Sequence, residues 1–115
     1  GVLAIWNDFG GDVRDIVFDN IVIEDARAGK PAIKLNITNV FGCNEQRRGS
    51  IRHVTFRDVA FLRTGDDAIV LSSPYEAGAI GHIGFERVTI NGEPVRSASD
   101  SRIRTEGAGE LRIIG

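Results

Sequence analysis

Hydrophobic and polar residues recur in the same order in three stretches of the chain, residues 13–23, 51–61 and 80–90. Each stretch has an aliphatic residue at its first, fourth and ninth positions, a phenylalanine at its sixth and an apolar residue at its eleventh. The stretches start 38 and then 29 residues apart. Self-similarity at a period of roughly 20 to 50 residues is typical of repeat architectures, so the pattern predicts a repeated structural unit.

The spacing inside each stretch predicts two short strands separated by a bend. Ile16 and Phe18 lie two residues apart, which places both side chains on one face of a strand. Ile21 and Ile23 are related in the same way, but the alternation slips by one residue at the polar Asp19 and Asn20. Because β-branched and aromatic residues dominate, the pattern favours strands over a helix with similar spacing.

A second set of apolar stretches, residues 2–6, 32–35 and 68–71, lies between the copies. One period therefore holds about three short strands, which predicts an all-β chain folded as a right-handed parallel β-helix, a β-solenoid of about three coils. Each strand would pair in parallel with its equivalent in the next coil, and Phe18, Phe56 and Phe85 would stack inside. A leucine-rich repeat would need leucines that are missing here, whereas a β-sandwich stays open from the number of strands alone.

The pattern also divides the chain. We expect the coils of the β-helix over residues 1–95 and terminal strands or a partial cap over residues 96–115. The chain has no methionine and begins at Gly1, so we expect a fragment of a longer solenoid. Such a fragment would expose unpaired strand edges and apolar surface, which predicts self-association through the exposed ends of the coils.

Composition narrows the possible partners. Hydrophobic residues make up 42% of the chain and charged residues 26%, with a formal net charge of −2. The charges are scattered without a basic stripe, so we expect no nucleic-acid partner. No apolar run approaches the roughly 18 residues of a membrane-spanning helix, so we expect no membrane partner either. The single cysteine, Cys43, excludes an intrachain disulfide and a cysteine metal cluster.

Residues 15–24, 53–59 and 83–95 carry a resemblance to the pectin-lyase-like β-helix proteins. In particular, the chain resembles the C-terminal coils of bacterial proteins related to family 28 glycoside hydrolases, the polygalacturonase group. The resemblance implies a secreted, periplasmic or cell-surface glycosidase that acts on a polysaccharide or oligosaccharide, with this segment alone inactive. Coil sequences also recur in lyases and non-enzymatic spikes, so a non-catalytic carbohydrate-binding or structural β-helix is the alternative.

Asp66 and Asp67 are the candidate catalytic residues. Hydrolysis of a glycosidic bond needs one carboxylic acid that donates a proton and one carboxylate that activates water or attacks carbon. Gly65, Asp66 and Asp67 lead into the apolar residues 68–71, as a Gly-Asp-Asp does in the polygalacturonase group. A polar turn between coils explains the same residues without catalysis. Two carboxylates alone are too few for a hard cation, so we expect no metal site, and no motif implies a cofactor.

The resemblance also implies residues that contact substrate. Gly81-His82 and Arg102-Ile-Arg104 are imperfect matches to the family's Gly-His-Gly and Arg-x-Lys. His82 occupies the same repeat position as His53, so the repeat explains it without a function.

Two aromatic residues complete the candidate set. Tyr75 lies in a predicted loop, where it is a candidate sugar contact. Trp6 is either a platform on which a sugar ring stacks or a core residue, since Val2, Ala4 and Trp6 share one face of a predicted strand.

Overall fold

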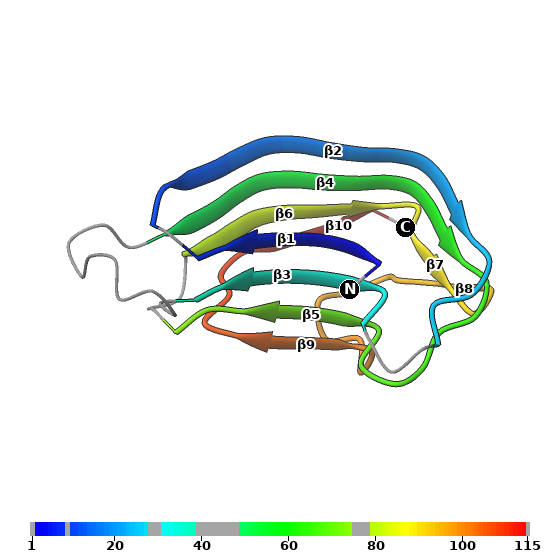
Figure 1. Ribbon diagram of the computed structural model, residues 1–115. Coiled ribbons are helices and arrows are strands. Elements are labelled where there is room, and N and C mark those ends of the chain that lie inside the picture. Colours follow the sequence, from blue (N-terminus) through cyan, green and yellow to red (C-terminus); the bar gives the residue numbers. More distant parts are fainter. Residues whose placement is uncertain (1, 9, 28–30, 39–48, 75–78, 115) are drawn as a thin grey trace.

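The structure is a computed structural model that describes the chain except for residues 1, 9, 28–30, 39–48, 75–78 and 115. Within the described residues every regular element is a β-strand and no helix occurs, as Figure 1 shows, so the all-β expectation is confirmed. The strands form two sheets.

Sheet A contains four strands, which are all parallel to their neighbours. In spatial order they are β1 (Leu3–Asn7), β3 (Ile33–Ile37), β5 (Ile69–Ser72) and β9 (Ile103–Glu106).

Sheet B is built around its long strand β4, which pairs with β2 on one side and with β6 and β7 on the other. Its members are β2 (Asp12–Ile23), β4 (Ser50–Phe61), β6 (Ile80–Glu86), β7 (Thr89–Ile90), β8 (Glu93–Pro94) and β10 (Leu111–Ile114). The last two strands of the chain lie in different sheets, β9 in sheet A and β10 in sheet B.

The expected single right-handed parallel β-helix is wrong. The strands belong to two separate sheets with mixed strand orientation, and in Figure 1 the arrows of sheet A point opposite to those of β2 and β4. One pair, β7 with β8, is antiparallel. The physical reason for that pair is the turn at Asn91 and Gly92, whose φ angles of 52° and 79° fit a two-residue hairpin turn.

The pairing of the repeated stretches is confirmed. Phe18 pairs with Phe56 across β2 and β4, and Phe56 pairs with Phe85 across β4 and β6. The ring centroids are 4.9 Å apart in the first pair and 5.4 Å in the second, with interplanar angles of 4° and 11°. The repeat therefore predicts both the strand register and the internal phenylalanine stack.

The predicted bend is also present in all three copies. Asn20, Asp58 and Arg87 have φ angles of 56°, 53° and 51°, in the left-handed region that non-glycine residues rarely adopt. Ion pairs across the strands join the bends, with Arg57 Nε 3.2 Å from Asp19 Oδ1 and Arg87 Nε 2.6 Å from Asp58 Oδ1.

A second irregularity, before the bend, was not predicted. Asp15, His53 and His82 have φ angles of 60°, 55° and 53°. The three-residue spacing from Val13 to Ile16 is the same kind of slip as the one at the bend, so the sequence contained the signal.

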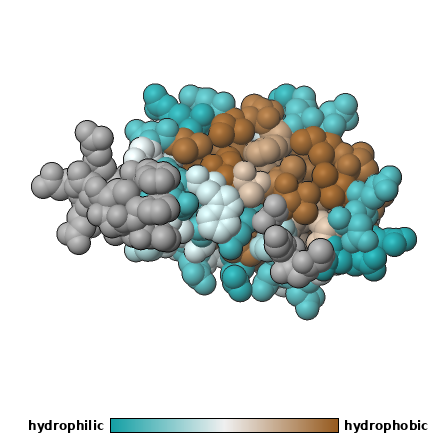
Figure 2. Space-filling model, in the orientation of Figure 1, coloured by the Kyte–Doolittle hydropathy of each residue, from teal (hydrophilic) through white to brown (hydrophobic). Residues whose placement is uncertain are grey.

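The core lies between the inner faces of the two sheets. Its largest fully buried side chains include Phe56, Phe61 and Phe85. The inward-facing side chains of β2, among them Ile16 and Phe18, are only partly buried, because β2 has a neighbour on one side only. Figure 2 shows apolar side chains gathered on the face of the molecule seen in Figure 1.

Candidate functional site

The outward face of sheet A carries two rows of side chains that cross its four strands. Because these parallel strands are in register, residues paired across them point to the same face. The first row is Ala4, Lys34, Val70 and Arg104, and the second row is Trp6, Asn36, Ser72 and Glu106. We call these two rows the sheet A face.

Trp6 is the only tryptophan, and it is 52% exposed. The core alternative for this residue is therefore wrong, since its neighbours Ile5 and Asn7 point inward instead. The Lys34 Nζ lies 4.9 Å from the centroid of the Trp6 ring, a cation–π contact between adjacent strands. This contact restrains an indole that is otherwise open to solvent.

Asp66 and Asp67 line a hollow of about 330 Å³ beside the first row of the sheet A face. Lys34, Val70 and Arg104 line the same hollow. The Arg104 Nη1 donates to Asp67 Oδ2 over 3.2 Å, and both side chains are about half exposed. The structure thus brings the candidate catalytic pair together with three cationic side chains, Arg27, Lys34 and Arg104.

The turn interpretation of this pair fits the backbone. Asp67 has a φ of 49° in the segment between β4 and β5, a conformation that aspartate tolerates better than most residues. A residue in a turn can also be catalytic. The catalytic role of Asp66 and Asp67 therefore stays a prediction.

A second, more open hollow of about 510 Å³ lies at the other end of the sheet A strands. Asn36, Ser72 and Glu106 of the second row line it, together with Thr38 and Ser73. Its lining therefore offers amide, hydroxyl and carboxylate groups, which both donate and accept hydrogen bonds.

Arg102 lines a further hollow with Asp66 and Asp67, but its donors are used within the protein. Its Nε donates to Asp100 Oδ1 over 2.8 Å, and its Nη1 donates to the Ile90 carbonyl oxygen over 3.1 Å. The hydrogen bonds that Arg102 donates to Asp100 raise the pKa of Arg102 above its ordinary value. With its side chain only 25% exposed, Arg102 holds the segment before β9 in place.

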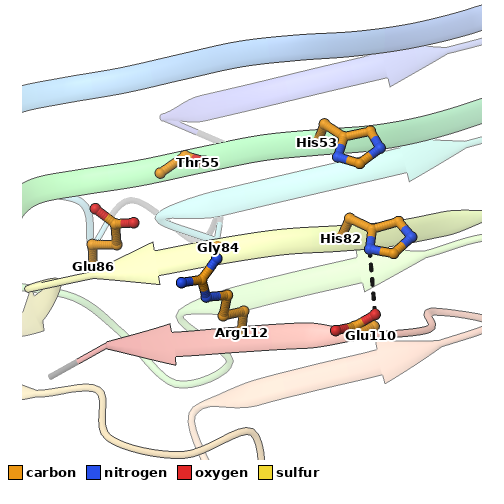
Figure 3. Close-up of a pocket in the computed structure, with 7 residues that line it drawn as sticks. All are labelled: His53, Thr55, His82, Gly84, Glu86, Glu110 and Arg112. Carbon is orange, nitrogen blue, oxygen red and sulfur yellow. Dashed lines mark ion pairs between the residues drawn. The ribbon is translucent and has the colours of Figure 1, made fainter.

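The other candidate contacts are not brought to the sheet A face. His82 lies on sheet B, in a hollow of about 320 Å³ that it shares with His53 (Figure 3). Tyr75 lies outside the described residues.

The sequence reasoning missed several residues of the sheet A face, namely Lys34, Asn36, Ser72 and Glu106. Their signal was the polar residue at every second position of an apolar stretch, as in Ile33 to Ile37.

No helix that is long and apolar enough to cross a membrane occurs in the described part of the chain. Nor do the described residues include a group of three or more histidine, cysteine, aspartate or glutamate side chains placed to hold a metal ion.

Comparison with known protein families, with curated proteins and with solved structures found no match to this chain.

Proposed function

We propose that the protein binds a carbohydrate chain along the sheet A face. The observation that carries the proposal is the exposed indole of Trp6, held by Lys34 at the start of a row of polar side chains. An aromatic ring offers a large, rigid apolar surface on which the C–H face of a sugar ring can stack.

The second row supplies the hydrogen bonds that sugar hydroxyls need. Asn36, Ser72 and Glu106 follow Trp6 across successive strands. Neighbouring strands are about 4.8 Å apart, so the row spans about 14 Å and suits an extended ligand better than a compact one. Glu106 and Ser72 also line the open hollow at this end of the strands. A ligand that stacks on Trp6 and crosses the row can reach the polar groups of Ser72 and Glu106, whereas Asn36 is buried, with 8% of its surface exposed.

The test uses the fluorescence of the single tryptophan, which reports directly on this face. Titration with soluble neutral and acidic polysaccharides should shift or quench the emission with a saturable dependence. Trp6→Ala, measured by calorimetry, should bind the same ligand on the order of tenfold more weakly, because it loses the stacking surface. Val22→Ala is the control, since Val22 is an exposed apolar residue on β2 of sheet B. Equal binding by Trp6→Ala and the native chain would overturn the proposal.

A second candidate function, hydrolysis of polysaccharide by a polygalacturonase-like enzyme, is favoured by the position of Asp66 and Asp67. Both line the hollow beside the first row of the sheet A face. Under this second candidate function, the protein would be exported or located at the cell surface. The ion pair of Asp67 with Arg104 counts against this candidate, because it occupies one carboxylate.

A reducing-sugar assay separates the two functions. We expect binding without hydrolysis at an enzymatic rate, because positioning of substrate and catalytic groups supplies about 7 to 11 kcal/mol in favourable cases and a carboxylate pair alone lacks it. Hydrolysis by the native chain that is lost in both Asp66→Asn and Asp67→Asn would establish the enzyme instead.

A further inference from the structure

The chain contains two histidines, and they stack on each other. His53 on β4 and His82 on β6 have ring centroids 4.8 Å apart and an interplanar angle of 2°. Both residues adopt a left-handed φ at the irregularity before the bend, and both side chains are exposed to solvent. Figure 3 shows the two rings side by side on neighbouring strands.

A carboxylate orients one of the two rings. The Nδ1 of His82 lies 3.3 Å from Oε2 of Glu110, the residue that precedes β10 (Figure 3). A carboxylate beside Nδ1 favours the proton on that nitrogen, which leaves the Nε2 lone pair free. Histidines that bind metal ions in proteins are almost always oriented in this way by a carboxylate, a carbonyl oxygen or water.

The surroundings favour a cation over an anion. The hollow around the two rings has a volume of about 320 Å³, and its ionised side chains are Glu86, Glu110 and Arg112. When the histidines are neutral, the two carboxylates and the one guanidinium give the hollow a net negative charge. Gly84 has no side chain, so the space between the rings and Glu86 stays open.

From these observations, we propose that His53 and His82 together bind one divalent transition-metal ion, with Glu110 as the orienting carboxylate. Imidazole nitrogen suits Zn²⁺, Ni²⁺ and Cu²⁺, and Cu²⁺ is bound most strongly of the three. Since the described residues hold no group of three ligands, water completes the coordination. The site lies on sheet B and does not depend on carbohydrate binding by sheet A.

Binding of one ion by both histidines requires the rings to turn out of their parallel stack. Bonds from zinc to histidine nitrogen are about 2.0 to 2.1 Å long, so two ligand nitrogens on one ion lie closer together than the stacked rings do. The side chain of His82 is 53% exposed, which leaves room for the ring rotation that brings the nitrogens together.

The test is calorimetric titration with Ni²⁺ and Zn²⁺ in a Cys43→Ser background, which removes the competing thiol. We expect one ion per chain. His53→Asn and His82→Asn should each weaken binding on the order of 100-fold, because the second ligand is lost from an intramolecular site. Asparagine tolerates the left-handed backbone at both positions, so these variants keep the fold. Asp58→Asn, a left-handed residue at the bend of β4, is the matched control and should bind normally.

Two further readouts separate a built site from chance binding by single histidines. Glu110→Gln should weaken binding by about tenfold, the effect of losing an orienting partner. Substoichiometric Ni²⁺ should broaden the imidazole proton signals of both histidines together in the native chain. Two independent ions per chain, or native affinity in either single histidine variant, would refute the proposal.

Discussion

The side chain of Asn7 fills the space against the backbone of Gly49, where a Cβ would meet Asn7 Nδ2 at 2.9 Å. Asn7 is buried, and its Nδ2 donates to the carbonyl oxygens of Gly11 over 2.7 Å and Ser50 over 3.1 Å. One amide group therefore joins the end of β1 to the starts of β2 and β4.

This contact predicts a large effect of a single methyl group. Gly49→Ala should displace the Asn7 amide and lower the free energy of unfolding by about 1 to 3 kcal/mol, the cost of a buried polar group that loses its partner. Urea denaturation followed by circular dichroism measures the change. Gly11→Ala is the control, because a Cβ at Gly11 meets nothing within 4 Å. A loss of stability at Gly11 as large as that at Gly49 would contradict the explanation.

The phenylalanine stack predicts a gradient of mutational cost. Phe56 is fully buried between two rings, whereas Phe18 at the edge is only partly buried. Phe56→Ala should cost about 3 to 5 kcal/mol of unfolding free energy, as is usual for a large aromatic residue in a core. Phe18→Ala should cost clearly less, measured in the same denaturant series. Equal costs would mean that the β2 edge is covered in solution.

The ion pairs predict loss of stability in acid. A hydrogen bond from Arg27 lowers the pKa of Asp25 from 3.8 to about 2, and hydrogen bonds from Arg87 and Arg102 lower the pKa values of Asp58 and Asp100. Because these folded-state values lie below those of the unfolded chain, their stabilisation is present above about pH 4 and is lost as pH falls toward 2.

Thermal unfolding across this range tests the assignment. Asp100→Asn should melt at a lower temperature than the native chain near neutral pH, and the difference should shrink as the pH approaches 2. Asp15→Asn serves as the control, because Asp15 has only an exposed contact of 3.7 Å with Arg14. If the melting temperature of the native chain stayed constant down to pH 2, these ion pairs would not contribute to its stability.

The partly buried inner face of β2 predicts self-association. Ile16 and Val17 are neighbours on this edge strand, with Ile16 packed against the core and Val17 exposed on the outer face. We expect concentration-dependent association in sedimentation velocity, driven by the uncovered apolar side chains. Ile16→Glu should reduce it, whereas Val17→Glu on the opposite face should have little effect. A monomer at every concentration would disprove the prediction.

The sequence predicted the register within sheet B because Phe18, Phe56 and Phe85 recur at one position of an otherwise variable pattern. It did not predict two sheets, because a period-2 pattern tells which side chains face a core and says nothing of how the strands are shared between sheets. Asn91 and Gly92 are residues typical of a tight turn, but the antiparallel pair that their hairpin makes between β7 and β8 was not predicted.

The candidate site shows the same limit. Asp66 and Asp67 are adjacent in the sequence, so any structure places them together. Lys34 and Arg104 reach the same hollow only through the pairing of β3, β5 and β9, which are far apart in the chain. Proximity across strands depends on register, and in sheet A no aromatic repeat marks it.

The stacked rings also bear on how this chain can change over evolutionary time. A residue that replaces Phe56 must fit Phe18 on one side and Phe85 on the other. A smaller side chain at position 56 would therefore lose contacts with both neighbours. We therefore expect paired substitutions in the stack, in which a smaller side chain at one position is accompanied by a larger one at an adjacent position. In sequences related to this chain, such a stack should produce covariation among positions 18, 56 and 85 more than strict invariance at any one of them.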